Sequence, residues 1–453
     1  MQIPRSSISE FIWPGIPLGA GSTLMGLQFQ LEQTQWWPAE TLAALQFRQL
    51  ECLLRYAYQT VPYYCRVLDA APIDVSQPLT PECWARIPLL ARQSLQDQAD
   101  DLVSHGLPGE HGGTFQNKTS GSTGQQIMVT DTNANRLFWQ AGTLRDHLWR
   151  QRDFSGRLVA IRSGRSAEDP LLVKDHPSWG PSTSQVYRTG PSTVFYQRMP
   201  IDRQAELLRA LDPAYLLVYP SNAVRLAHYF RAHDLHLPNL REVMTYGESM
   251  LPETRAVCRD AWGVAVADMY SCEEVGYIAL QCPQTEHYHC QSESVLVEVL
   301  DDEGRPCSPG QIGKVVLTSL HNFAMPLIRY QIEDYAEVGP PCPCGRGLPV
   351  IKRILGRERN MATSDDGARF WPQLSPEIWG GISGIDELQL VQNDVDHIEL
   401  RLVCQQPLDA GQERNLTDRF AQALGRPYRF SIRYHDETLR HANGKCERFI
   451  CEV

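Results

Sequence analysis

The sequence predicts an α/β protein with a large N-terminal domain, built from βαβ sheets and a β-rich subdomain, and a small α+β domain at the C-terminus. The 453 residues exceed what one ordinary hydrophobic core serves, so two or three domains are expected. Strand and helix patterns alternate up to about residue 320, which favours parallel βαβ units. A smaller unit follows, and we predict the domains 1–356 and 357–453.

The composition indicates a folded protein, with 42% apolar and 21% charged residues. The net charge is −11 and no cluster of Lys and Arg occurs, so nucleic acid is not expected as a partner. The longest apolar stretch is interrupted by Pro14 and Pro17 and lacks a basic leader, so we expect no membrane segment, no cleaved signal and a cytoplasmic location. Thirteen scattered cysteines do not resemble a disulfide framework.

Helices are predicted for most of the first hundred residues. Within residues 39–59 the apolar side chains form one helical stripe, made of Leu42, Leu45, Leu50, Leu53, Leu54 and Ala57. Strands are predicted at residues 157–163, 214–221, 241–247 and 264–271, with helices at residues 202–212 and 222–234. Ligands of parallel sheets bind at the carboxyl ends of the strands, and we expect the functional site there.

The pattern becomes antiparallel after residue 290. Residues 294–304 and 311–320 are predicted to form two strands of the β-rich subdomain. In the C-terminal unit, residues 387–404 predict a hairpin with its turn at Asn393 and Asp394. A helix at residues 411–424 and a strand at residues 428–435 complete the predicted α+β module.

One loop carries the first functional signal. Residues 118–126, KTSGSTGQQ, are rich in hydroxyl groups and glycines and precede an apolar, β-branched run. Two interpretations fit this loop: a cradle whose hydroxyls and unhindered backbone N–H groups wrap a triphosphate, or a solvated linker. It is not the ordinary P-loop, because no Gly-Lys-Ser/Thr closes it.

Five further stretches follow in order: TYGES (245–249), DMYSCEEVG (268–276), RYQIED (329–334), GRERN (356–360) and NGKCER (443–448). Together with TSGSTG (119–124), the series resembles the motifs of the adenylate-forming (acyl- and aryl-CoA ligase) superfamily. The phrases MPLIRYQIED and CPCGRGLPVIKRILGR resemble its phenylacetate–CoA ligase branch. The resemblance spans the chain from about residue 40 to the end. It implies an acid–thiol ligase that uses ATP to form an acyl-adenylate and then a CoA thioester, releasing pyrophosphate and AMP.

The resemblance also implies the nucleotide site. The phosphates would bind to Thr119, Ser120, Gly121, Ser122, Thr123 and Gly124. Gly247 and Glu248 would lie along the adenine and the acid, and Tyr270 would stack on the adenine. Asp334 would accept hydrogen bonds from the ribose hydroxyls, and Arg357 would reach the same sugar or the α-phosphate.

Magnesium is expected on Glu274, since a hard cation prefers carboxylate and phosphate oxygens. The chain departs from the family pattern nearby, because Ser271 replaces a glycine and Glu273 replaces a hydroxyl residue. Gln125 and Gln126 stand where many relatives have Gly-Lys, which removes one mobile cation near the phosphates. We expect this last change to weaken ATP binding.

Catalysis is assigned to Lys445, which follows Gly444 where the family keeps a lysine on its mobile C-terminal domain. A lysine near a chain end is ordinarily a solvated charge. Here its ammonium would neutralise the charge that grows on oxygen when a carboxylate attacks the α-phosphorus. The resemblance implies a hinge at Glu358, Arg359 and Asn360, although the usual aspartate pair is missing, and a pantetheine channel beside Gly367.

A zinc site is predicted from closely spaced thiols and imidazoles, which suit a tetrahedral metal centre, and relatives that share CPCGR often hold a structural zinc. The predicted ligands are Cys282, His289, Cys342 and Cys344, with His287 or Cys290 as substitutes. The other interpretation is a group of cysteines without metal in a β-rich loop.

The acid is expected to be flat and mostly apolar, because the predicted pocket is aromatic and poor in cations. Its lining would include Tyr219, Tyr246, Met269 and Tyr277, although core packing would explain these residues equally well. The sequence leaves open whether the acyl group passes to CoA, a carrier-protein thiol or an amine, and whether the chain forms a homodimer. A nucleotide-binding scaffold without catalysis is the alternative from a different class.

Overall fold

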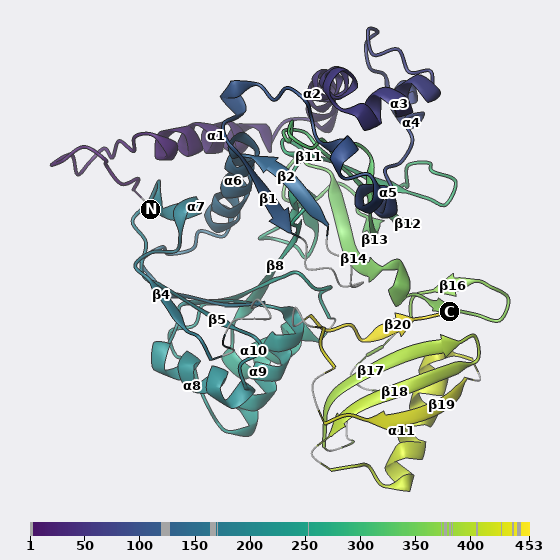
Figure 1. Ribbon diagram of the computed structural model, residues 1–453. Helices are drawn as coiled ribbons and strands as arrows, with labels where there is room; N and C mark the ends of the chain where they lie inside the picture. Colours follow the sequence, from purple (N-terminus) through teal and green to yellow (C-terminus); the bar gives the residue numbers. More distant parts are fainter. Residues whose placement is uncertain are drawn as a thin grey trace.

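A computed structural model of the chain describes residues 3–118, 127–163, 169, 171–251, 253–372, 374–375, 378–379, 382, 384–404, 406–426, 428–436, 439–441 and 445–453. One twelve-stranded sheet forms most of the molecule, in the strand order β11-β12-β13-β14-β10-β9-β8-β7-β6-β3-β5-β4. A separate four-stranded sheet lies near the C-terminus (Figure 1). The mixed α/β fold class is confirmed.

Helices dominate the N-terminal hundred residues, as predicted. They are α1 (Ala20–Thr34), α2 (Ala39–Thr60), α3 (Pro62–Ala70), α4 (Pro81–Ala85) and α5 (Arg92–Asp97), with 3-10 turns η1 (Asp100–Leu102) and η2 (Gly109–His111). The predicted stripe of α2 is buried except for Leu45, which is 41% exposed. Gln46 is buried in its place, because its side-chain N–H group donates to the carbonyl oxygen of Ser292 at 2.7 Å.

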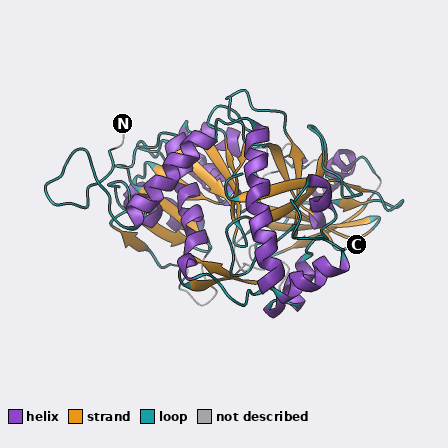
Figure 2. Ribbon diagram, turned by 90° about the horizontal axis from the view of Figure 1, so that it is seen from above, coloured by secondary structure: helices purple, strands orange, loops and turns teal. Residues whose placement is uncertain are grey.

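The parallel half of the large sheet contains β3 (Leu158–Arg162), β5 (Ser192–Tyr196), β6 (Tyr215–Val218), β7 (Glu242–Tyr246) and β8 (Ala265–Cys272). Strand β4 (Lys174–His176) adds an antiparallel edge. The helices of this half are α6 (Asn133–Trp149), α7 (Pro181–Ser184), α8 (Ile201–Leu211), α9 (Pro220–Ala232) and α10 (Thr254–Trp262). Seen from above, helices lie across the strands (Figure 2), and Val159, Ile161 and Val243 are fully buried, as parallel strands require.

The antiparallel half contains β9 (Gly276–Gln281), β10 (Tyr288–Cys290), β11 (Val295–Leu300), β12 (Ile312–Ser319), β13 (Tyr330–Val338) and β14 (Val350–Arg357). The predicted β-rich subdomain is therefore present but not a separate sheet. Strand β9 pairs antiparallel with β8, with Met269 opposite Leu280, and this pairing joins the two halves. The hairpin β1 (Thr114–Lys118) and β2 (Met128–Thr132) lies apart from the large sheet.

The C-terminal sheet has the order β19-β18-β17-β20. After η3 (Glu358–Asn360), β15 (Ala362–Thr363) and β16 (Arg369–Phe370) come β17 (Ile385–Asp394), β18 (His397–Cys404), α11 (Ala410–Leu424), β19 (Arg429–Tyr434) and β20 (Phe449–Cys451). The hairpin turn lies after Asp394 rather than at Asn393 and Asp394, because those two residues still belong to β17. This unit has its own hydrophobic cluster, which includes Leu390, Leu400 and Phe420.

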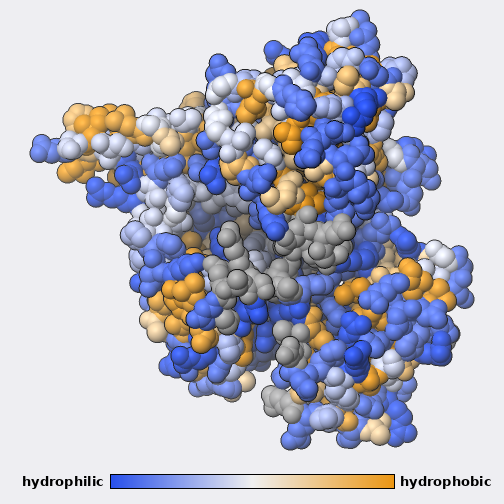
Figure 3. All heavy atoms as spheres, in the orientation of Figure 1, coloured by the Kyte–Doolittle hydropathy of each residue, from blue (hydrophilic) through white to orange (hydrophobic). Residues whose placement is uncertain are grey.

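Exposed apolar side chains are concentrated on the N-terminal arm, which projects from the body of the molecule (Figure 3). Phe11, Ile12 and Trp13 are 53%, 86% and 75% exposed. Within the described parts of the chain, no helix combines the length and the apolar character needed to cross a lipid bilayer.

Candidate active site

The first part of the candidate site contains Asp334 and Arg357, which lie opposite each other on β13 and β14. The Arg357 Nε atom lies 3.6 Å from Asp334 Oδ1, and the Tyr270 hydroxyl donates to Asp334 Oδ2 at 2.7 Å. Burial raises the pKa of the Asp334 carboxyl, while the charge of Arg357 and the hydrogen bond from Tyr270 oppose that rise. The three predicted nucleotide-binding residues thus form one group, held by an ion pair between Asp334 and Arg357 and a hydrogen bond between Tyr270 and Asp334.

Glu274 is the second part of the site and is only 7% exposed. The Arg92 Nη1 atom lies 3.3 Å from Glu274 Oε1, and the Tyr330 hydroxyl donates to the same oxygen at 3.4 Å. Arg92 was missed by the sequence analysis. Its α5 position, 182 residues before Glu274, carries no motif that would connect the two residues.

Lys445 lies against the turn that follows β7. Its Cε atom is 3.7 Å from the position that a Cβ atom would occupy at Gly247, which has a φ of +75°. That Cβ atom would also come within 2.6 Å of the Tyr219 ring, so both conformation and space require glycine here. Burial, followed by the charge of Arg357, lowers the pKa of Lys445, while the carboxylates of Glu248, Asp334 and Glu274 oppose the shift. The ammonium therefore interacts electrostatically with the charged residues of the site.

Glu248 lies next to Gly247 and makes two hydrogen bonds to backbone groups. Its carboxylate accepts hydrogen bonds from the backbone N–H groups of Ser221 at 3.0 Å and Cys446 at 2.8 Å. Its side chain is 5% exposed. The residue therefore connects the start of α9 to the backbone beside Lys445.

Two groups of aromatic side chains lie near these residues. The rings of Tyr219 and Tyr246 stack with their centroids 4.5 Å apart. A small cavity of about 20 Å³, enough for about one water molecule, is lined by Tyr277 together with Phe138, Trp139 and Glu273. Met269 does not line this cavity, because it packs with the hydrophobic cluster around Leu280. The helix residues Phe138 and Trp139 were not predicted, since only an apolar helix face marks them in the sequence.

The predicted hinge is in contact with the C-terminal strand. Arg359 Nη2 lies 2.7 Å from Glu447 Oε2, and the Asn360 side chain donates to the carbonyl oxygen of Phe449 at 2.8 Å. Gly367 forms the turn between β15 and β16 with a φ of +78°. The predicted phosphate residues Thr119, Ser120, Gly121, Ser122, Thr123 and Gly124, with Gln125, Gln126 and Gly444, lie outside the described residues.

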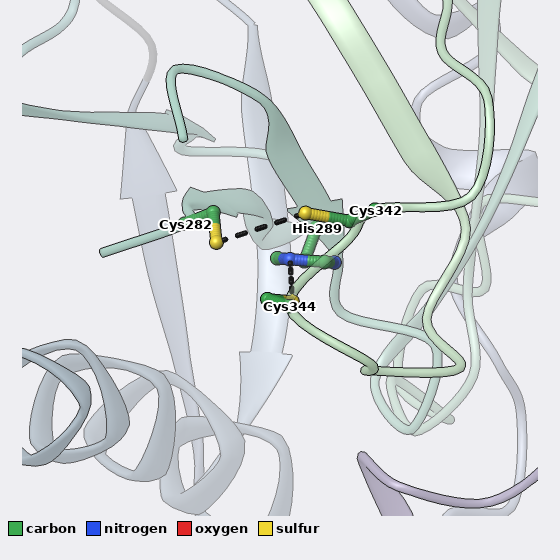
Figure 4. Close-up of side chains that lie close together, drawn as sticks. All are labelled: Cys282, His289, Cys342 and Cys344. Atoms are coloured by element: carbon green, nitrogen blue, oxygen red, sulfur yellow. Dashed lines mark hydrogen bonds between the residues drawn. The ribbon is translucent and has the colours of Figure 1, made fainter. Parts of the chain in front are cut away.

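The predicted metal ligands Cys282, His289, Cys342 and Cys344 come together beside β10 (Figure 4). Their ligand atoms lie within 4.8 Å of one another, with 3.8 Å between the sulfur atoms of Cys342 and Cys282 and 3.3 Å between Cys344 Sγ and His289 Nε2. Two sulfur ligands about 2.3 Å from a tetrahedral zinc ion lie about 3.8 Å apart, so the donors fit zinc. Burial, and then the charge of Arg346, lowers the pKa of His289 to about 4, which keeps the imidazole neutral as a metal ligand requires.

Comparisons with known proteins agree with these features. Residues 365–452 match the family model described as the CapK C-terminal domain. The chain is 26% identical over 397 residues to a phenylacetate-coenzyme A ligase of Thermus thermophilus, covering 83% of this chain and 85% of the relative. A phenylacetate-coenzyme A ligase of Pseudomonas putida is 25% identical over 444 residues, which cover 90% of this chain and 94% of the relative.

The fold is also that of solved CoA ligases. A 2-hydroxyisobutyryl-CoA ligase in the postadenylation state, in complex with an acyl-AMP, aligns with a TM-score of 0.73 at 22% identity, covering 93% of this chain and 92% of that chain. The same ligase in the thioesterification state aligns with a TM-score of 0.60 at 21% identity, over 93% and 91% of the two chains. The chain is therefore similar over most of its length to phenylacetate-coenzyme A ligases, and it shares the fold of a solved CoA ligase.

Proposed function

We propose that the protein uses ATP to convert a carboxylic acid to an acyl-adenylate and then transfers the acyl group to CoA. The observation that carries the proposal is the position of Lys445. Its ammonium lies within electrostatic reach of Asp334, Glu274 and Arg357, although it comes from the other domain. This mixture of charges suits the binding of a nucleotide and the neutralisation of charge on its α-phosphate.

In the first step, the acid's carboxylate oxygen attacks the α-phosphorus and pyrophosphate leaves with the bond electrons. Asp334 would hold the ribose, Arg357 the ribose or the α-phosphate, and Tyr270 the adenine, with Gly247 leaving room beside them. Lys445 would stabilise the charge that develops in the transition state more than that of the bound substrates. Glu274 would hold Mg²⁺, which supplies positive charge to the phosphates when bound. In the second step, the CoA sulfur attacks the acyl carbon and AMP leaves.

The aromatic side chains near the candidate site favour an aromatic acid as the substrate class. Phe138, Trp139 and Tyr277 provide flat apolar surface beside the residues of the candidate site. The stacked pair of Tyr219 and Tyr246 would line the inner crevice near Lys445.

Zinc on Cys282, His289, Cys342 and Cys344 would have a structural role. The four ligands come from β9–β10 and from the loop before β14, so one ion would join both sides of the antiparallel half. When bound, a closed four-ligand zinc site contributes folding free energy and no open position for substrate.

The test is acid-dependent exchange of labelled pyrophosphate into ATP, measured with a panel of arylacetates, benzoates and aliphatic acids. We expect exchange with an aromatic acid in the absence of CoA, and formation of thioester and AMP when CoA is added. Exchange without CoA consumption would instead favour transfer to a carrier-protein thiol or an amine. The absence of exchange with every acid would favour a nucleotide-binding scaffold and contradict the proposal.

A further inference from the structure

Glu248 holds the backbone at the residue that follows Lys445. Its Oε1 atom accepts the Cys446 N–H group at 2.8 Å, and its Oε2 atom accepts the Ser221 N–H group at 3.0 Å. Ser221 lies in the first turn of α9, where backbone N–H groups have no partner within the helix and favour a carboxylate. One carboxylate of the N-terminal domain thus links a helix N-terminus to the catalytic segment of the C-terminal domain.

Arg440 strengthens the same connection from the other domain. Its Nη1 atom donates to the Ser221 hydroxyl at 2.8 Å and lies 4.0 Å from Glu248 Oε1. Its Nε atom lies 3.3 Å from Glu387 of β17. Each of these three charged side chains is 5% to 7% exposed. We call Ser221, Glu248, Glu387, Arg440 and Cys446 the Glu248 junction.

The junction fixes the segment on both sides of Lys445. The His441 N–H group donates to the Lys445 carbonyl oxygen at 3.0 Å, which ties the backbone of the lysine to that of His441. The next amide, that of Cys446, is held by Glu248. A side chain on a segment restrained in this way loses less conformational freedom when it meets its target, which is how supporting residues position a catalytic group.

The Glu248 junction can form in only one arrangement of the two domains. Its partners come from both domains, so it exists only while Arg440 and Cys446 lie against the end of β7 and the start of α9. This arrangement resembles the postadenylation structure more closely than the thioesterification structure, with TM-scores of 0.73 and 0.60. Rotation of the small domain would separate Glu248 from the Cys446 amide and leave a buried carboxylate without that partner.

We propose that Glu248 is a positioning residue for Lys445, acting in the adenylation half-reaction alone. This inference rests on the proposed function. A hydrogen bond to a buried charged group contributes about 1.5–3 kcal/mol, equivalent to about a 10- to 100-fold change. The variant Glu248→Gln should therefore lower the kcat of acid-dependent pyrophosphate exchange about tenfold or more, with the KM for ATP within about twofold of the wild type. Thioester formation from pre-formed acyl-adenylate should stay within about twofold.

The matched control is Glu253→Gln. Glu253 is also a carboxylate of the N-terminal domain paired with an arginine of the C-terminal domain, Arg448, but it makes no contact with Lys445 or Cys446 that the described residues show. Its loss should reduce exchange less than about threefold, because it removes an ion pair at Arg448 but, in the part of the chain that the structure describes, no hydrogen bond to the backbone of Lys445 or Cys446. Equal losses in both variants would show general domain docking and overturn the proposal. A rise in the KM for ATP without a change in kcat would show a nucleotide contact and overturn it as well.

Hydrogen exchange of the peptide containing Cys446 supplies a readout that needs no activity. Glu248→Gln should increase exchange of this peptide while β18 stays protected, and Glu253→Gln should not. A wild-type protein without pyrophosphate exchange would contradict the proposed function, whereas unchanged protection of the Cys446 peptide in Glu248→Gln would contradict the junction.

Discussion

Replacement of Lys445 by methionine tests the catalytic assignment most sharply, because methionine keeps much of the length of the side chain and removes its charge. Two unit charges about 4 Å apart at an effective dielectric constant of about 20 interact by about 4 kcal/mol. This dielectric constant suits Lys445, because the side chain is half-buried and interacts with the charges of Asp334, Glu274 and Arg357. We therefore expect Lys445→Met to slow acid-dependent pyrophosphate exchange by about a thousandfold.

The same variant should convert pre-formed acyl-adenylate and CoA to thioester at a rate within about threefold of the wild type, because that step forms no new charge on the α-phosphorus. Lys352→Met is the control, since Lys352 is half exposed on β14 and pairs with Glu337. Equal loss in both half-reactions, or a loss of less than about tenfold in exchange, would refute the role assigned to Lys445.

Three further outcomes are expected. First, because its environment lowers the pKa of Lys445 and the ammonium is the active form, exchange should decline as pH rises through a value below the ordinary lysine pKa. The decline should be absent in Lys445→Arg, whose guanidinium stays charged, and a wild-type profile that is flat up to the ordinary lysine range would contradict it. Second, Asp334→Asn should raise the KM for ATP about 10- to 100-fold, measured by exchange at varied ATP, since the ribose loses a charged acceptor; an unchanged KM would remove Asp334 from the nucleotide site. Third, Cys342→Ser should lower bound zinc, measured by elemental analysis, and reduce the Tm by about 5 °C or more, while Cys404→Ser changes neither; equal zinc content in both variants would contradict the ligand set.

The order of the motifs predicted which residues make up the site, but it predicted few of the contacts between them. Asp334 and Arg357 could be paired in advance because both belong to short motifs. The structure explains their proximity, since they lie opposite each other on adjacent antiparallel strands. Neighbours on paired strands interact even when they are far apart in sequence.

Contacts made across long sequence separations could not be predicted. Arg92 reaches Glu274 from a short helix in a different part of the chain. The role of Glu248 depends on how the C-terminal domain docks, which no local pattern encodes. The buried face of α2 was predicted to include Leu45, but Gln46 is buried and Leu45 is exposed. This difference also depends on a long-range contact, because a buried glutamine is favourable only when tertiary hydrogen bonds satisfy its amide group.

The boundary between the two halves of the large sheet also could not be predicted from the sequence. Alternating strands and helices predicted the parallel half, and runs of β-branched residues predicted the antiparallel half. Neither pattern specifies which strands form the seam. That seam is the β8–β9 pairing, and it places Glu273 and Glu274 in the turn between the two strands, at the point where the candidate site is built.

The proposed reaction cleaves ATP between the α- and β-phosphates. The most direct measurement is ³¹P NMR of the wild-type protein with ATP, Mg²⁺, CoA and the acid that supports exchange. We expect AMP and pyrophosphate in equal amounts, with one thioester formed for each AMP. ADP and inorganic phosphate as the products would contradict the proposed reaction.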